Sequence, residues 1–452
     1  MKLFVNLYLA LFLVFTNANV ITIQLKREIN NDIEDNKIFL SQESNTNQIY
    51  ELINVQNYKK QWYTGTISLG KGKKNLKVIL STGSNQLMIP SKSCVDQKNC
   101  NGFEKYYECQ SQDGCTPTNS QGTYNYLDST LTGNYVNTLV SIGDLESIQQ
   151  SVLLFDQSNN FTAYNQKVNG ILGLGGYNFN NDGNSSFVTS LYKQGLIKEN
   201  MFSLYLGFKN DDSQLTLGGI NPQNLADKAK VFTHQLIQND QSDLQRWVLQ
   251  ITQFDMGVFS YKFNTTYNKA LVDSSYPYIG LEQSLYEKVA QYFIKRHANV
   301  TKNGLKVDCK DPNLSNMYFY LIQERTLSQC LYLPIDFYLS NTTYDCQILI
   351  SPINSNQNYG VILGSPFLRR YVSSYSYQNK QITFTQSIAD PKDDTSNDFS
   401  ITDLPTWAII VIVIAAVIVL CIGGGIFAYK KYKNKQMGNS LQISFSSNTS
   451  SH

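Results

Sequence analysis

Lys77-Val-Ile-Leu-Ser-Thr-Gly-Ser84 is a hydrophobic run that ends in a turn of small residues. Apolar and β-branched residues followed by Gly and Ser predict a strand that leads directly into a tight turn. A second run, Ala270-Leu-Val-Asp-Ser-Ser275, has the same pattern. It carries Asp273 at the position that Ser81 holds in the first run. The two runs are therefore the first sign of a repeated unit.

A second pair of motifs supports the repeat. Ile171-Leu-Gly173 begins 90 residues after Ser81, and Ile362-Leu-Gly364 begins 89 residues after Asp273. Each short motif alone is common, but both in the same order and at matched spacing indicate an internal duplication. We therefore predict two homologous lobes with a cleft between them, the kind of place where ligands bind.

The residues around these motifs predict a mostly β protein. Apolar and β-branched alternation bounded by Gly, Asn and Ser predicts strands over 63–69, 76–89 and 214–217. Helical patterns are few, and the best cover 186–194 and 281–294.

From about residue 55 to 386, the motifs resemble those of the pepsin-like aspartic protease family, peptidase A1. Gln61-Trp-Tyr-Thr-Gly-Thr-Ile-Ser-Leu-Gly70 is similar to the family's first strand. Ser81-Thr-Gly-Ser-Asn-Gln-Leu-Met-Ile-Pro90 matches its first active-site segment except at the first residue. Ile362-Leu-Gly-Ser-Pro-Phe-Leu-Arg-Arg-Tyr371 resembles its C-terminal signature. The resemblance implies a bilobal fold of two β-barrel-like lobes, over 55–240 and 241–386, with a cleft between them.

The resemblance also implies a defect in the chemistry. Two Asp side chains face each other across the family's cleft and share one proton, because like charges so close cannot both ionise. Here Asp273 is retained, and Ser81 stands in place of the other aspartate. A serine hydroxyl cannot alternate between acid and base, so we expect Asp273 to ionise at mildly acidic pH. Loss of one acid–base group costs about 10²–10⁴ in rate.

Neighbouring residues retain more of the scaffold than of the chemistry. Thr82 and Ser274 keep the hydroxyls that brace the two turns in the family, and Gly83 and Ser84 complete the first turn. The second turn departs from the family pattern at Ser275, which is expected to crowd the turn because glycine permits a closer backbone approach.

A segment resembling the family's flap is also altered. Tyr126 keeps the position of the tyrosine that covers the substrate, while Leu127 and Ser129 replace two glycines. The bulkier flap tip is expected to change peptide entry. An ordinary cross-strand role for Tyr126 is the alternative.

The three histidines argue against two other kinds of site. His234, His297 and His452 are scattered along the chain and far in sequence from the turns. A nucleophilic Ser81 would need a base within hydrogen-bond reach, and a zinc site would need clustered ligands. We therefore expect no metal and no cofactor, and each histidine is expected on the surface.

The chain ends predict a secretory, single-pass type I membrane protein. Residues 1–18 resemble a signal peptide, and 19–54 resemble a pro-segment. Residues 387–404 read as a stalk, and 405–429 are long and apolar enough to cross a bilayer. Lysines follow in 430–452, which places this tail in the cytosol. The membrane is expected to be the cell surface or a vacuolar or endolysosomal membrane.

This compartment permits disulfides and N-glycosylation. Four cysteines lie in the first half: Cys94, Cys100, Cys109 and Cys115. Sequence alone leaves their pairing open. In the second half we favour a Cys309–Cys346 pair with Cys330 left as a thiol. Glycosylation candidates are Asn160, Asn184, Asn264, Asn299, Asn313 and Asn341.

Three functions remain open from the sequence. The favoured one is a catalytically impaired protease homologue that binds a peptide or protein in its cleft. The others are an active aspartic endopeptidase working at acidic pH and a structural surface glycoprotein with a closed cleft. The formal net charge of +2 gives no reason to expect nucleic acid. Turnover would single out the second function, and peptide binding would separate the first from the third.

Overall fold

The computed structural model describes residues 21–25, 52–53 and 62–388. The last range has gaps at 97–99, 101–102, 104, 127–128, 160–167, 177–185, 208–212, 238–244, 302–303, 312–313, 325–326, 342–344 and 355–356. The predicted signal peptide, most of the stalk, the predicted membrane span and the tail lie outside the described residues. Within the described residues, none of the helices combines the length and the apolar character needed to cross a membrane.

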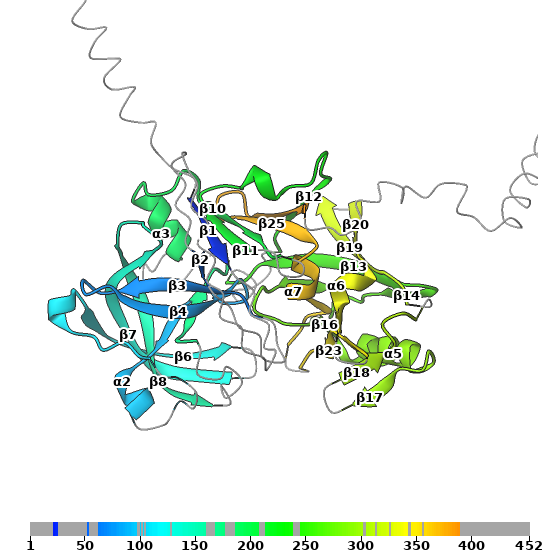
Figure 1. Cartoon of the computed structure of the whole chain (residues 1–452), viewed down its shortest axis with the longest axis horizontal. Helices are drawn as coiled ribbons and strands as arrows, with labels where there is room; N and C mark the ends of the chain where they lie inside the picture. The colour runs from blue at the N-terminus through cyan, green and yellow to red at the C-terminus, as the bar shows by residue number, and fades with distance from the viewer. Residues whose placement is uncertain are drawn as a thin grey trace, which may run out of the picture. The chain divides into compact units, whose positions relative to one another are not determined.

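Strands dominate both halves, as the sequence predicts. One sheet of the N-terminal half has seven strands. Their order is β3 (Thr64–Leu69), β4 (Lys74–Ser81), β9 (Ile171–Gly173), β5 (Leu87–Pro90), β8 (Ile148–Asn159), β7 (Ser129–Ile142) and β6 (Thr116–Tyr126). The labelled strands β3, β4, β6, β7 and β8 lie together on the left of Figure 1. The long β6–β7 hairpin ends at the pair Tyr126 and Ser129.

The C-terminal half contains an eight-stranded sheet and a small four-stranded one. The larger follows the order β20 (Leu327–Leu333), β19 (Met317–Glu324), β13 (Val248–Met256), β15 (Lys269–Val272), β24 (Val361–Leu363), β16 (Ile279–Leu281) and β23 (Ile350–Pro352), with β14 (Phe259–Lys262) paired to β13. The smaller contains β17 (Asn299–Thr301), β18 (Gly304–Val307), β22 (Cys346–Ile348) and β21 (Leu339–Asn341).

The predicted internal duplication is visible in the strand pairing. In the first half β4 runs parallel to β9, β9 antiparallel to β5, and β5 parallel to β8. In the second half β15, β24, β16 and β23 repeat these three pairings in the same sense. In each half the turn motif thus lies at the end of a buried strand. The apolar-apolar-Gly segment pairs with that strand.

A third large sheet joins the two halves. Its order is β12 (Val231–Gln235), β26 (Gln381–Gln386), β25 (Tyr371–Ser376), β10 (Met201–Tyr205), β11 (Ser213–Leu217), β1 (Ile21–Leu25) and β2 (Leu52–Ile53). The last two described strands, β25 and β26, therefore pair with β10 and β12 of the N-terminal half. β1, from the predicted pro-segment, pairs with β11 over its whole length.

Both predicted helices are present, and each has a side-chain cap. Ser186 precedes α3 (Phe187–Lys193), and its Oγ accepts a hydrogen bond from the amide of Thr189 at 3.2 Å. The Glu282 carboxylate caps α5 (Gln283–Ile294) through the amides of its first turn. Such caps satisfy amides that lack a partner within the helix. The other short helices are α2 (Lys92–Asp96), α6 (Ile335–Tyr338), α7 (Ser365–Leu368), η1 (Ser111–Asp113) and η3 (Pro222–Asn224).

Three disulfides settle the pairing that the sequence left open. Cys94–Cys100 and Cys109–Cys115 each span 5.3 Å between Cα atoms. Cys309–Cys346 forms as predicted, with a Cα–Cα distance of 5.0 Å. Cys330 is a free thiol, also as predicted.

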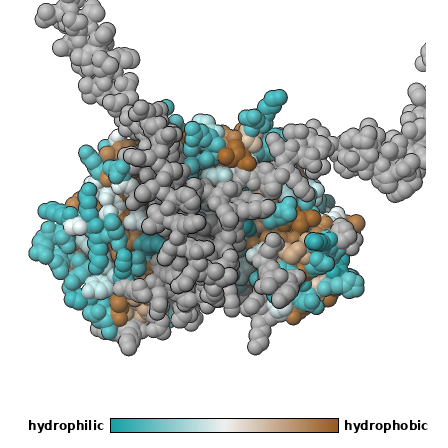
Figure 2. All heavy atoms as spheres, in the orientation of Figure 1, coloured by the Kyte–Doolittle hydropathy of each residue, from teal (hydrophilic) through white to brown (hydrophobic). Residues whose placement is uncertain are grey.

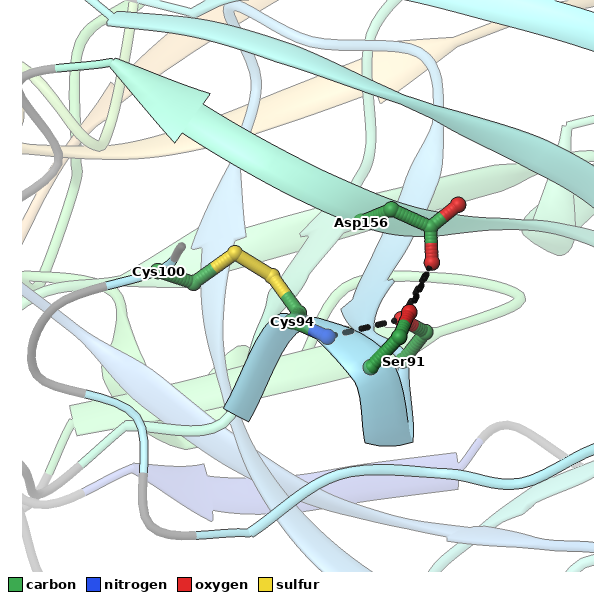
Figure 3. Close-up of a disulfide and its surroundings, with 5 residues drawn as sticks. Ser91, Cys94, Cys100 and Asp156 are labelled. Atoms are coloured by element: carbon green, nitrogen blue, oxygen red, sulfur yellow. Dashed lines mark hydrogen bonds between the residues drawn. A yellow bond between two sulfur atoms is a disulfide. The ribbon is translucent and has the colours of Figure 1, made fainter. Parts of the chain in front are cut away.

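The Cys94–Cys100 disulfide is anchored to the sheet by polar contacts (Figure 3). Ser91 Oγ accepts from the Cys94 amide at 3.2 Å and donates to the Asp156 carboxylate on β8. Ser93 donates to the same carboxylate oxygen. The short helix α2 and its disulfide are thereby fixed to β8.

Around the β3–β4 turn the described side chains are mostly hydrophilic (Figure 2). Asn264 and Asn299 are exposed, as glycosylation requires. Asn160, Asn184 and Asn313 lie outside the described residues, and nothing is described of the Asn341 side chain.

The expectation of surface histidines is wrong for His234. Its side chain is fully buried, and its Nδ1 lies 3.1 Å from the Ile322 carbonyl oxygen on β19. The reason is that β12 pairs with β26 on one side and packs against β19. Burial lowers the pKa of His234. His297 is exposed, as expected, and His452 lies outside the described residues.

Candidate active site

The two turn motifs meet and are locked together by four hydrogen bonds. The Thr82 amide donates to Ser274 Oγ at 3.1 Å, and the Ser274 amide donates to Thr82 Oγ1 at 2.9 Å. Each hydroxyl also donates across to the strand that precedes the other turn, Thr82 to Val272 and Ser274 to Leu80. These bonds are the bracing that the sequence predicts for Thr82 and Ser274. They fix the ends of β4 and β15 relative to each other.

Asp273 lies at the centre of this junction and is only 5% exposed. Its Oδ1 accepts three hydrogen bonds: from the Gly83 amide at 3.2 Å, the Ser275 amide at 2.9 Å and Ser275 Oγ at 2.6 Å. Burial raises the pKa of the Asp273 carboxyl, because desolvation disfavours the charged form. The hydrogen bonds from Ser275 and Gly83 and the positive charge of Arg246 act in the opposite direction.

Ser81 is fully buried and reaches Asp273 through a second hydroxyl. Its Oγ lies 3.0 Å from Ser275 Oγ. A hydroxyl has one proton to donate, and that of Ser275 points to Asp273. While Asp273 is ionised, Ser81 must therefore donate to Ser275. The result is a chain from Ser81 through Ser275 to Asp273.

The expectation that Ser275 crowds the second turn is wrong. Its backbone is outside the positive-φ region. Its hydroxyl occupies space next to the short Ser81 side chain and is bonded on both sides. The two serines therefore fit each other: the short Ser81 side chain leaves room for the Ser275 hydroxyl.

Gly83 and Ser84 have different tasks in the first turn. A Cβ atom at Gly83 would collide with the Asp273 carboxyl, so only glycine allows the amide to approach. Ser84 is buried, and its Oγ accepts from the amide of Gln86 at 3.3 Å. Ser84 thus holds the turn, whereas Gly83 contacts the carboxyl.

Two aromatic residues, Trp247 just before β13 and Tyr377 just after β25, support the first turn. The Leu174 amide donates to the Ser81 carbonyl at 2.7 Å. The Leu174 carbonyl in turn accepts from Trp247 Nε1 at 2.7 Å and from the Tyr377 hydroxyl at 3.2 Å. Trp247 and Tyr377 pack edge-on with ring centroids 5.1 Å apart. All of these groups are buried, so the base of the site is rigid.

Arg246 is a site residue that the sequence analysis missed. In the antiparallel pairing of β13 and β15, Val248 lies opposite Leu271. The Val272 amide donates to the Trp247 carbonyl at 2.9 Å, so the next step places Arg246 opposite Asp273. Only the strand register brings the two together, and no sequence motif could have shown it.

Tyr124, rather than the predicted Tyr126, provides the described contact from the β6–β7 hairpin. The Tyr124 hydroxyl donates to Asn85 Oδ1 at 3.4 Å. Tyr126 ends β6, but its side chain is outside the described structure. The flap assignment of Tyr126 therefore stays a prediction.

The arrangement places one buried carboxyl group, Asp273, beside the hydroxyls of Ser81 and Ser275, both of which are fully buried. Among the described residues, the side chain that hydrogen-bonds Asp273 is a serine, and no second carboxyl joins it. Groups of three or more His, Cys, Asp or Glu side chains able to hold a metal do not occur in the described part of the chain.

Comparison with known proteins agrees with the duplicated fold. The model of the eukaryotic aspartyl protease family matches residues 62–387, which is most of the chain. Plasmepsin I of Plasmodium falciparum is 24% identical over 380 residues, covering 80% of this chain and 76% of that protein. Pepsin A-5 of Mus musculus is 32% identical over 190 residues, 41% of this chain and 47% of that protein. Aspartic proteinase A1 of Arabidopsis thaliana is 28% identical over 181 residues, and the match spans only 36% of its length. The chain therefore belongs to the pepsin-like family of eukaryotic aspartyl proteases.

Proposed function

We propose that this chain is a catalytically impaired aspartic protease homologue that binds peptides or an extended protein segment between its lobes. The observation that carries the proposal is the hydrogen-bonded chain from Ser81 through Ser275 to Asp273. Ser81 stands where the family pattern has its first catalytic aspartate. Ser275 fills the space beside it.

The chemistry follows from this chain of groups. Peptide hydrolysis by a carboxyl dyad needs one group to take a proton from water while the other gives a proton to the scissile carbonyl. Asp273 can do one of these at a time. The Ser81 and Ser275 hydroxyls can pass or hold a hydrogen bond, but they do not ionise at acidic pH. Catalysis is expected to fall by about 10²–10⁴ or more, because the members of a dyad act as a unit.

Binding does not need the dyad. The four cross-lobe hydrogen bonds and the aromatic base keep the turns in register without it. Peptide recognition is expected to use the partly exposed groups around the turns, which include Arg246, Tyr124 and Tyr276.

The test is hydrolysis and binding measured on the full chain, produced through a eukaryotic secretory pathway and purified in mild detergent. Wild type and Asp273→Asn are incubated with a denatured protein digest between about pH 3 and 7. We expect equal, background cleavage by both and measurable peptide retention by both. Cleavage by wild type that disappears in Asp273→Asn would show an active endopeptidase, the alternative function, and would overturn the proposal.

We also propose that the protein is held in a membrane of the secretory pathway with its lobes on the luminal or extracellular side. The support is the apolar segment 405–429, the lysines after it and the three disulfides of the folded part. Alkaline carbonate extraction of expressing cells should leave the full chain in the membrane pellet. A chain ending before Leu404 should be secreted; retention of this truncated chain would contradict the anchor.

A further inference from the structure

Arg246 carries a positive charge next to the Asp273 turn and has few partners there. Its guanidinium donates to the Tyr359 hydroxyl at 3.1 Å. Burial disfavours its charge, but the Tyr359 and Tyr124 hydroxyls and the Asp273 carboxyl outweigh burial and raise the pKa of Arg246. Arg246 is not among the donors to Asp273 Oδ1: its three hydrogen bonds come from Gly83 and Ser275. A guanidinium has five N–H donors, so most of this capacity is available to a ligand.

Asn85 adds a second donor to the same place. It is 6% exposed, and its Nδ2 has no hydrogen-bond partner among the described residues. Its amide faces the Tyr124 hydroxyl, the group that also feels the charge of Arg246. A buried amide donor without a partner costs free energy, which a ligand oxygen would recover.

We propose that Arg246 and Asn85 form a subsite beside Asp273 that binds an acidic side chain, Glu or Asp, of a peptide ligand. The inference rests on the proposed peptide binding and names the ligand class. A carboxylate matches the planar fork of an arginine in two parallel hydrogen bonds, and a charged acceptor is the partner that a partly desolvated guanidinium requires. Tyr359 adds a hydroxyl that accepts from Arg246 and can donate to the same carboxylate, whereas the Tyr124 hydroxyl donates to Asn85.

The neighbouring Asp273 modulates this subsite. An ionised Asp273 attracts the Arg246 guanidinium and competes with a ligand carboxylate. A protonated Asp273 is neutral and leaves the guanidinium to the ligand carboxylate. Because burial favours the protonated form of Asp273, the subsite is expected to be most selective for acidic residues under acidic conditions. The charged and titratable groups around Arg246 in the described structure are Asp273, Tyr359 and Tyr124.

The experiment uses the full chain in detergent and random hexapeptide pools that are amidated at the C-terminus. Each pool fixes Glu, Gln or Lys at one position in turn, so glutamate supplies the only fixed carboxylate. Binding is measured at pH 5 by fluorescence anisotropy of the labelled pools. Wild type should bind the best Glu pool about 10- to 100-fold more tightly than the matched Gln pool, as expected for a charge-assisted contact. Lys pools should bind least.

Variants assign the effect to the subsite. Arg246→Gln should remove the preference for Glu, and Arg246→Lys should keep part of it because the charge remains. Arg296→Gln is the matched control: Arg296 stacks on Tyr292 at the end of α5, and its loss should leave the preference unchanged. Thermal unfolding of each variant shows that it is folded.

The outcomes separate this inference from the proposed function. If no pool binds wild type, peptide binding and the acidic subsite both fail. If pools bind without preference for Glu, the subsite is wrong while peptide binding stands. If the preference survives in folded Arg246→Gln, another residue reads the charge and the assignment is overturned.

Discussion

Replacing Ser81 with Asp is the obvious way to restore a carboxyl dyad, and the structure predicts that this change alone fails. Ser81 Oγ and Ser275 Oγ are 3.0 Å apart, so no gap separates them. An aspartate side chain has two more heavy atoms than serine, and its carboxyl group would enter the space of the Ser275 side chain. Overpacking of a buried site costs about 1–3 kcal/mol. Removal of the Ser275 hydroxyl is therefore needed at the same time.

The second quantity to estimate is the electrostatic repulsion between a carboxylate at position 81 and Asp273. Ser275 Oγ lies 3.0 Å from Ser81 Oγ and 2.6 Å from Asp273 Oδ1. The distance from Ser81 Oγ to Asp273 Oδ1 therefore cannot exceed the sum of these two lengths. At a separation of about 5.5 Å and an effective dielectric constant of about 20, two carboxylates repel by about 3 kcal/mol. This corresponds to a separation of about two pKa units between the two ionisation steps. A new carboxyl at position 81 would thus share one proton with Asp273, as the family's chemistry requires.

The assay is hydrolysis of quenched fluorescent peptide pools between pH 3 and 6 by four proteins: wild type, Ser81→Asp, Ser275→Gly and the double variant. We expect the hydrolysis rates of wild type and of both single variants to remain near background. The double variant should gain at least about 100-fold, the lower range for an acid–base group. Thermal unfolding should show Ser81→Asp to be the least stable of the four.

Two results would refute this reasoning. Ser81→Asp cleaving as fast as the double variant would show that the Ser275 hydroxyl does not occupy the place of the carboxyl. A double variant that is folded but inactive would show that the altered flap, rather than the dyad, limits the chemistry.

Three further predictions concern stability. Loss of the Cys309–Cys346 disulfide, which closes a loop of 37 residues, should cost about 3–4 kcal/mol, more than loss of either six-residue disulfide in the N-terminal half, as measured by denaturant unfolding. Because burial raises the pKa of Asp273, the stability of wild type relative to Asp273→Asn should fall as pH rises from the ordinary carboxyl value of 3.8; a constant difference in Tm from pH 3 to 7 would contradict this. Trp247→Phe removes the donor to the Leu174 carbonyl and should destabilise the protein by about 1–3 kcal/mol in the same unfolding assay, with no change expected if that hydrogen bond is absent.

Local sequence patterns were enough to predict the strands over 63–69 and 214–217, both longer helices and the duplication, whereas the strand predicted over 76–89 is divided by the turn between β4 and β5. The hydrophobic runs before Ser81 and Asp273 form strands because apolar β-branched residues favour buried sheet positions. The matched spacing to the apolar-apolar-Gly segments predicted the duplication, and the structure shows it as the repeated parallel pairings β4–β9 and β15–β24. Both helices began at residues able to cap them.

The candidate site was predicted from the sequence only in part. The residue types of the two turns, including the serine at position 81 and the hydroxyls of Thr82 and Ser274, are properties of the sequence. The positions of Ser275, Arg246 and Asn85 relative to Asp273 are not.

The sequence by itself determined which strands form, where the turns fall and which chemical groups the turns carry, because these depend on neighbours along the chain. Only the tertiary structure decided that Ser275 fills the space left by Ser81, that Arg246 lies opposite Asp273, and that His234 is buried. These outcomes depend on strand register and on packing between residues far apart in sequence, and a shift of one residue in register would change each of them.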